Sequence, residues 1–155
     1  MIAIVQRVLS AAVTADGLPA GEIGPGLLIL LGVVDGDGKA EAATLAAKTA
    51  NLRIFCDEAD KMNRSLLDTA GGALVVSNFT LAADVRKGNR PSFTGAASPD
   101  VAERLYEAYM AELRRLGVSR VENGRFGADM QIAMTADGPV TITLDTDIWK
   151  RPKHA

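Results

Sequence analysis

The sequence predicts one α+β domain with a mainly antiparallel sheet and two helices. Three observations support this fold class. Several segments are strand-like, with alternating or continuous apolar residues, whereas only two have the i, i+3, i+4, i+7 spacing of a helix. Short turn signals join neighbouring strand-like segments, and the helices do not alternate strictly with strands, which disfavours a doubly wound parallel sheet. A length of 155 residues, with 48% hydrophobic and 23% charged residues, is typical of a single globular domain.

The first four expected elements are strands. Ile2–Val8 alternates along the chain and reads as the first of them. Ala11–Ala15 and Leu18–Ile23 flank Asp16-Gly17, which is a hairpin signal. A Gly/Pro turn then precedes Leu27–Val34, an apolar run that is typical of a buried strand and too short to span a bilayer.

Two segments predict helices. Lys39–Leu52 carries small and apolar side chains at helical spacing along one face. The second helix begins at Ser98, a preferred N-cap residue, followed by Pro99, which suits the first helical position; Gly117 suits the stop. Its expected buried stripe consists of Val101, Leu105, Ala108, Tyr109, Leu113 and Leu116.

The remaining strands are expected between and after the helices. They are Arg53–Phe55, Ala73–Thr80, Val118–Asn123, Asp129–Thr135 and Pro139–Asp145. The last two strands are joined by a predicted tight turn at Asp137-Gly138-Pro139. The polar segment Leu81–Phe93 predicts a long loop, which is often functional. We expect one domain over residues 1–146 and a polar C-terminal tail over residues 147–155.

Composition excludes several kinds of chemistry. The one cysteine, Cys56, excludes an internal disulfide and a cysteine-cluster zinc site, and we expect a buried or half-buried thiol. The one histidine, His154, lies in the tail, so no Ser-His-Asp or Cys-His arrangement is available. No phosphate-binding glycine motif or calcium loop occurs. We therefore expect neither a metal nor a cofactor.

The charge pattern limits the possible partners. A net charge of −2 disfavours a protein that grips a nucleic-acid duplex along its length. Local contact is conceivable at Arg86, Lys87 and Arg90, or at the cations of the tail, although both sets could simply be solvated surface. No apolar run is long enough for a membrane span and the N-terminal residues have no signal layout, so we predict a cytoplasmic protein.

An enzyme built from these residues must work with hydroxyl groups, backbone amides and geometry. Positioned amides can stabilise the oxyanion of a reactive ester, and a water held in line can attack without a strong base. The apolar strand Ala73–Thr80 ends in Ser77, Asn78 and Thr80, so its hydroxyls and N–H groups would face whatever binds there. Ser and Thr close many strands, and Gly138-Pro139 could be only a turn. Each motif alone is weak evidence for a functional site, whereas the two together are specific evidence.

The two motifs lead to a family resemblance along nearly the whole chain. The sequence resembles the D-aminoacyl-tRNA deacylases, whose Ser-Gln-x-Thr and Asn-x-Gly-Pro-Val-Thr motifs are matched by Ser77–Thr80 and Ala136–Thr141. Further matching segments in the same order are Ile4–Val8, Leu52–Phe55, Lys61–Asn63, Arg86–Gly88, Arg90–Phe93 and Gly124–Met130.

The resemblance implies an RNA-dependent hydrolase. Such an enzyme cleaves the ester between a D-amino acid and the acceptor end of tRNA without a metal, and glycyl-tRNA is an expected further substrate. It implies a homodimer in which a cis Gly138-Pro139 bond enters the partner subunit's pocket. The carbonyls of this dipeptide would hold the substrate's α-amino group, and an L side chain would collide with the motif. Backbone atoms and the substrate's 2′-hydroxyl would direct the attacking water.

The resemblance also assigns roles to side chains. Thr80 and Ser77 are the candidate catalytic residues, with Thr80 expected to position first and to act as a nucleophile only second. Arg7 would brace the Gly-Pro turn, although taken alone it could be a strand-edge charge. The other candidate substrate-binding residues are Asn78, Phe79, Phe126 and Met130, of which Phe126 and Met130 would on their own more often be core residues.

Two positions depart from the family pattern. Asn78 stands where the family has Gln, and Ala136 stands where it has Asn. Two alternatives therefore stay open. One is a relaxed deacylase with a trans Gly-Pro bond that removes a mischarged small L-amino acid. The other is a non-catalytic module that binds tRNA ends or another partner.

Overall fold

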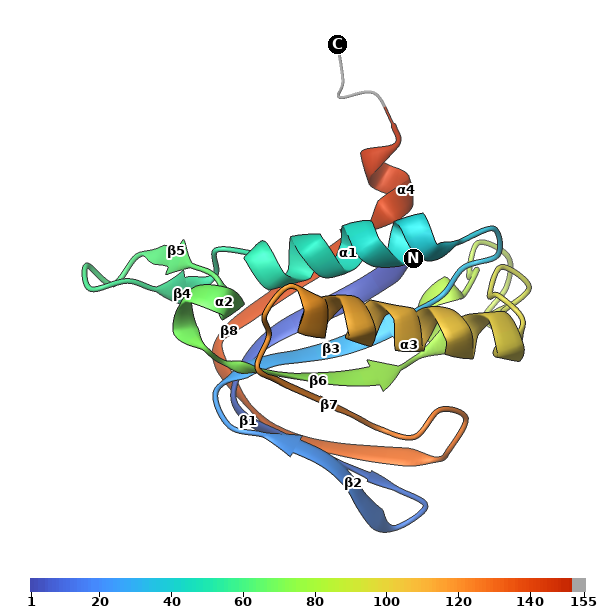
Figure 1. Cartoon of the computed structure of the whole chain (residues 1–155). Coiled ribbons are helices and arrows are strands. Elements are labelled where there is room, and N and C mark those ends of the chain that lie inside the picture. The colour runs from blue at the N-terminus through green and yellow to red at the C-terminus, as the bar shows by residue number, and fades with distance from the viewer. Residues whose placement is uncertain (152–155) are drawn as a thin grey trace.

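The computed structural model describes residues 1–151, which form two layers, a curled sheet and a pair of packed helices (Figure 1). The main sheet contains β1 Ile2–Ala15, β2 Leu18–Ile23, β3 Gly26–Gly32, β6 Gly72–Ser77, β7 Arg120–Asn123 and β8 Met130–Asp145. The long helices are α1 Lys39–Asn51 and α3 Pro99–Arg115. The short elements are β4 Phe55–Cys56, β5 Met62–Arg64, α2 Leu66–Thr69, the 3₁₀ helix η1 Phe79–Ala82 and α4 Thr146–Trp149.

The sheet is mixed, so the prediction of a mainly antiparallel sheet is correct only in part. β1 pairs antiparallel with β2, β3 and β8, whereas β3 pairs parallel with β6, and β6 pairs parallel with β7. A helix-containing connection leads into each parallel strand, through α1 to β6 and through α3 to β7. The continuous apolar runs of β3 and β6 are typical of parallel strands buried on both faces.

The α+β class is correct, although residues 1–151 contain four α-helices rather than two. The two extra helices, α2 and α4, contain four residues each, too few to show helical periodicity in the sequence. The tail expected from residue 147 begins with α4, and Lys150 pairs with Glu41 of α1 (Nζ to Oε1, 3.0 Å). His154 lies outside the described residues. No helix within residues 1–151 is long and apolar enough to cross a membrane.

The predicted turn between the last two strands is wrong. β8 is continuous from Met130 to Asp145 and pairs with β1 over almost its whole length. Asp137–Val140 lie opposite Arg7, between the pairs Gln6–Thr141 and Val8–Ala136, so an irregularity in the pairing accommodates the Gly-Pro segment without ending the strand. The hairpin predicted at Asp16-Gly17 does join β1 to β2, and both residues have positive φ.

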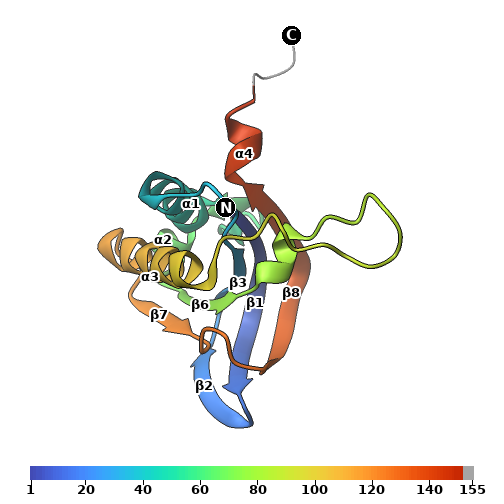
Figure 2. The same cartoon turned by 90° about the vertical axis from the view of Figure 1, so that its right-hand side faces the viewer.

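Alternating side chains divide the core between the two faces of the sheet. Leu27, Ile29 and Leu31 of β3 pack toward α1 and α3, while Leu28 belongs to a second cluster on the other face of the curled sheet. Figure 2 shows both helices on one side of the sheet and the curl of β1 and β2 below them. The hydroxyl of Tyr109 on α3 donates to Thr49 Oγ1 on α1 (2.9 Å), which joins the helices inside the core.

Candidate functional site

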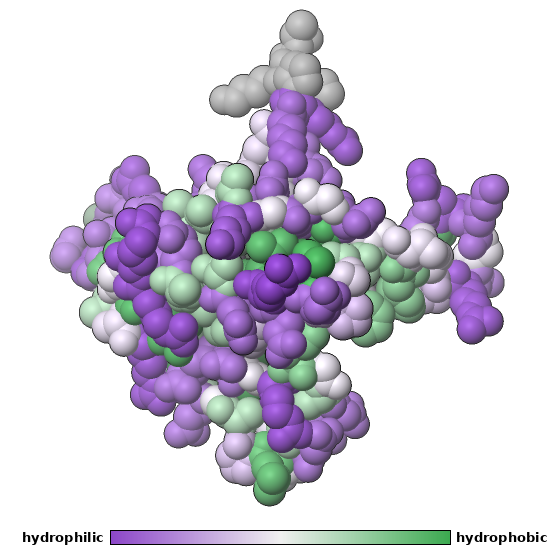
Figure 3. Space-filling model, turned by 45° about the vertical axis from the view of Figure 1, so that its right-hand side comes forward, coloured by the Kyte–Doolittle hydropathy of each residue, from purple (hydrophilic) through white to green (hydrophobic). Residues whose placement is uncertain are grey.

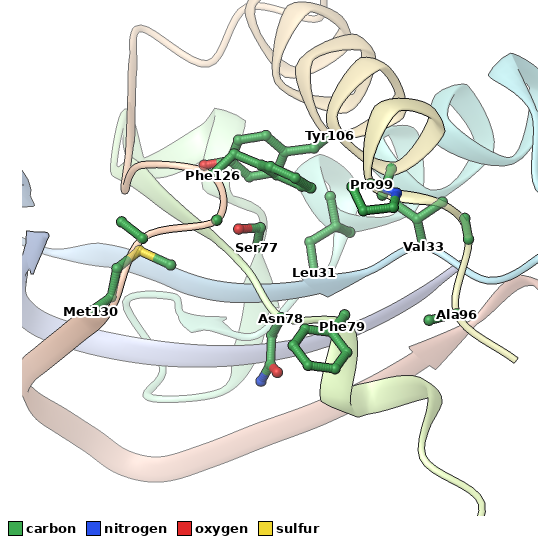
Figure 4. Close-up of a pocket in the computed structure, with 14 residues that line it drawn as sticks. Leu31, Val33, Ser77, Asn78, Phe79, Ala96, Pro99, Tyr106, Phe126 and Met130 are labelled. Atoms are coloured by element: carbon green, nitrogen blue, oxygen red, sulfur yellow. The ribbon is translucent and has the colours of Figure 1, made fainter. Parts of the chain in front are cut away.

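A cavity of about 470 Å³ opens at the carboxyl ends of the parallel strands β3 and β6 (Figure 4). Carboxyl ends of parallel neighbours lie at the same sheet edge, where open sheets commonly bind ligands. The lining comes from both strand ends, the start of α3 and the segment before β8: Leu31, Val33, Ser77, Asn78, Phe79, Ala96, Ala97, Pro99, Ala102, Tyr106, Phe126, Gly127, Ala128 and Met130. The predicted residues Ser77, Asn78, Phe79, Phe126 and Met130 therefore meet at one site.

Asn78 organises the polar edge of this cavity. Its backbone N–H donates to the carbonyl oxygen of Leu31 (2.8 Å), which fixes the end of β6 against β3. Its side-chain Oδ1 accepts from the N–H of Thr80 (3.2 Å) and from the Thr80 hydroxyl, and so caps η1. Thr80 is exposed and lies beside the lining residues rather than among them. Its hydroxyl therefore bonds to an amide oxygen, with no basic partner among the hydrogen bonds of residues 1–151.

Aromatic side chains form one wall. The rings of Tyr106 and Phe126 lie 6.0 Å apart between centroids, and Figure 4 shows both above Ser77 and Leu31. The hydroxyl of Tyr106 donates to the carbonyl oxygen of Val75 (2.9 Å). Burial raises the pKa of Tyr106 to about 12, so this side chain stays neutral at physiological pH. The wall is therefore apolar and uncharged.

Phe79 stands at the rim. Its ring is 59% exposed and meets Phe93 edge to face, with centroids 5.1 Å apart. An aromatic pair of one exposed and one half-buried ring beside an apolar cavity offers a stacking surface for a planar ligand.

Arg7 and the Gly-Pro dipeptide lie apart from this cavity. Arg7 is 8% exposed; its Nε donates to the backbone oxygen of Asp137 (3.2 Å) and pairs with the Asp137 carboxylate (3.1 Å). Its Nη1 donates to the carbonyl oxygen of Ile54 (2.6 Å). Cys56 lies 3.9 Å from the same nitrogen and is exposed, not buried or half-buried as predicted, because its short strand is at the surface.

The dipeptide itself is exposed on β8. The Gly138–Pro139 bond is cis, whereas the relaxed-deacylase alternative expected a trans bond. Gly138 has φ +125°, and a Cβ there would lie 2.9 Å from Val140 Cγ2 and 3.3 Å from Arg7 Nη2. Glycine is therefore required at this position. Gly138, Pro139 and Arg7 do not line the cavity of their own chain.

Sequence reasoning missed part of the lining. Leu31 and Val33 end the strand beside Ser77, and Pro99, Ala102 and Tyr106 lie on the first turns of α3. Leu31 and Val33 could have been found by assuming that the apolar strands β3 and β6 pair in parallel, because their carboxyl ends then meet at one edge. Pro99, Ala102 and Tyr106 could not be identified from the sequence, because a helical pattern does not distinguish a cavity wall from a core face.

Comparison with known proteins decides the family. The family model for D-Tyr-tRNA(Tyr) deacylase matches residues 4–145. The chain belongs to this deacylase family. A D-aminoacyl-tRNA deacylase of Roseiflexus sp. (strain RS-1) is 58% identical over 154 residues, covering 99% of both chains. One from Deinococcus radiodurans is 58% identical over 145 residues, covering 94% of this chain and 99% of its own.

Solved structures agree with the deacylase fold. A structure described as the c-Myc DNA unwinding element binding protein has a TM-score of 0.89 at 40% identity, covering 94% of this chain and 99% of its own. The structure of a probable eukaryotic D-amino acid tRNA deacylase has a TM-score of 0.79 at 17% identity, covering 92% of this chain and 97% of its own. At this low identity the similarity shows the fold alone.

Proposed function

We propose that this protein hydrolyses D-aminoacyl-tRNA to free tRNA and a D-amino acid. The observation that carries the proposal is the apolar cavity ending in Ser77, Asn78 and the start of η1, in a chain of the deacylase family. A volume of about 470 Å³ suits a nucleoside, since small-molecule sites span about 300–1,000 Å³. The terminal adenosine of the acceptor end would lie against the aromatic wall, with the cytoplasm as the place of action.

The proposed chemistry needs no side-chain base. Water attacks the ester carbonyl, the bond to the ribose oxygen breaks, and that oxygen leaves with a proton. Phe79 opens η1, so its N–H has no acceptor within that helix and could stabilise the oxyanion. Ser77 and Thr80 would position substrate and water, and the hydrogen bond from Thr80 to Asn78 supports this role over a nucleophilic one. The substrate's 2′-hydroxyl would orient the attacking water.

The proposed chirality check uses a second copy of the chain. Gly138 and Pro139 of one protomer would enter the cavity of its partner, where their carbonyls would accept hydrogen bonds from the α-amino group. An L side chain would then meet the dipeptide, while a D side chain would point outward, and glycine would pass. Two features support this homodimer: the dipeptide is exposed in the single chain, and Arg7 braces it from below.

The test compares D- and L-tyrosyl-tRNA with the protein in the presence of EDTA. We expect hydrolysis of the D substrate alone, undiminished by the chelator. Within residues 1–151 no three His, Cys, Asp or Glu side chains are grouped as metal ligands. Equal rates on both substrates would support a relaxed deacylase instead. Loss of activity with EDTA would overturn the metal-free chemistry, and tRNA binding without turnover would favour a non-catalytic module.

A further inference from the structure

A basic loop projects from the mouth of the cavity. Asp84 and Ser92 exchange two backbone hydrogen bonds (2.7 and 2.9 Å), which form a neck and leave residues 85–91 as a lobe. Phe79 precedes the neck and Ala96 follows it, and both line the cavity. Figure 2 shows this connection between η1 and α3 reaching well away from the body of the protein. The lobe is therefore fixed beside the site at both of its ends.

The lobe carries three cations with different roles. Arg86 binds Asp84 in a bidentate pair (Nε to Oδ1, 2.9 Å; Nη2 to Oδ2, 2.6 Å). These bonds lower the pKa of the Asp84 carboxyl to about 2, so the pair persists at physiological pH and braces the neck. Lys87 and Arg90 are exposed and take part in no ion pair within residues 1–151. Figure 3 shows hydrophilic side chains on the projecting lobe.

The placement of these charges is informative because the whole chain carries a net charge of −2. Two unpaired cations on a projecting lobe form a local positive site in a field that is otherwise weakly negative. Seven residues that run out and back reach roughly 10 Å, at about 3.3 Å per residue. A lobe of this reach can contact a nucleic-acid strand that leaves the mouth of the cavity.

We infer that the 85–91 lobe binds the phosphate backbone of the tRNA next to its terminal adenosine, through Lys87 and Arg90. The inference rests on the proposed function, because the strand that enters the cavity must pass the rim at Phe79 and Phe93. Phosphate contacts fix the register of a nucleic acid without reading its sequence. The lobe would therefore contribute affinity and orientation for the RNA body, while the cavity handles the aminoacyl adenosine.

The experiment compares two substrates in the full-length protein. One is D-tyrosyl-tRNA, and the other is D-tyrosyl-adenosine, which has no phosphate. For the double variant Lys87→Gln/Arg90→Gln we expect kcat/KM to fall about tenfold on the tRNA and to stay unchanged on the adenosine ester. The dependence of log kcat/KM on log salt concentration should become shallower by about 2, near one unit per lost phosphate contact. Lys61→Gln, which removes one exposed lysine beside β5, is the control for loss of a surface charge outside the lobe.

The outcomes separate the proposals. Equal loss on both substrates, or no loss on the tRNA, overturns the phosphate contact. Loss on both together with a change in sedimentation overturns it in favour of a lobe that contacts a second protein copy. Inactivity of the wild type on D-tyrosyl-tRNA rejects the proposed function itself, whatever the variants do. A tRNA-specific loss that Lys61→Gln does not share supports the inference.

Discussion

Arg7 shows how one buried side chain connects three segments that are distant in sequence. Its guanidinium reaches Asp137 on β8 and the carbonyl oxygen of Ile54 before β4, from the middle of β1. A planar group with five donors can bridge these acceptors, which one ammonium group cannot do with the same geometry. The position of Gly138-Pro139 therefore depends on a side chain that never lines the cavity.

Arg7→Lys tests this dependence. We expect a loss of about 1–3 kcal/mol in the free energy of unfolding, because buried acceptors lose their donors. The kcat/KM for D-tyrosyl-tRNA should fall by up to about 10²-fold, the scale of a 1 Å misplacement. The ratio of D to L hydrolysis should also fall, as measured below the melting temperature. An unchanged ratio at reduced stability would leave Arg7 with a purely structural role.

Asn78 provides a second test at the residue scale. If backbone N–H groups of η1 carry the chemistry, Asn78→Gln should change kcat/KM little, because the amide can still reach toward Thr80. Asn78→Ala removes the cap of η1 and should cost about 0.5–2 kcal/mol of stability. A large gain in kcat/KM for Asn78→Gln would show that the side chain itself contacts the substrate.

At the scale of elements, α3 contributes both to the cavity wall and to the core, through two tyrosines about one turn apart. Tyr106 bonds the carbonyl oxygen of Val75 at the cavity wall, whereas Tyr109 is fully buried and bonds Thr49 of α1. The helix thus joins the site to the core. Its length and N-terminal start were predictable, because Pro99, the helical stripe and Gly117 are local signals.

The variants Tyr106→Phe and Tyr109→Phe separate the contribution to the cavity wall from the contribution to the core. Each variant loses one buried hydrogen bond, so we expect each to lose about 0.5–1.5 kcal/mol in urea unfolding. Only Tyr106→Phe should raise KM for D-tyrosyl-tRNA, since Tyr109 does not line the cavity. A larger effect on KM from Tyr109→Phe would mean that the packing of α3 on α1 shapes the site.

The elements that could not be predicted are those decided by distant pairing. β8 reads locally as two strands and a turn, yet it pairs with β1 on both sides of Asp137–Val140 and continues as one strand. The parallel pairing of β3 with β6 is equally non-local, and it forms the edge where the cavity opens. The sequence motifs identified Ser77, Asn78 and Phe79 because strand ends are local, while Leu31 and Tyr106 depended on topology.

At the scale of the whole molecule, β8 is an edge strand that carries exposed apolar side chains. Among the described residues 1–151 it pairs with β1 alone, so its other edge has backbone groups without a strand partner there. Ile132 is 39% exposed and Met134 41%, on the same strand as the exposed Gly138-Pro139. An edge strand with apolar side chains is typical of a surface that a second subunit covers, and this supports the proposed dimer.

Met134→Glu tests whether the exposed face of β8 forms a dimer interface that the active site requires. A charge within an apolar interface is costly to bury, so we expect a monomer in sedimentation velocity and a loss of about 10²-fold or more in kcat/KM for D-tyrosyl-tRNA. Met62→Glu is the matched control, because Met62 is also exposed, at 57%, but lies on β5 rather than β8. It should leave assembly and activity unchanged. A Met134→Glu monomer with full activity and full D selectivity would reject the shared site, because the dipeptide of one protomer would then not be needed by the other.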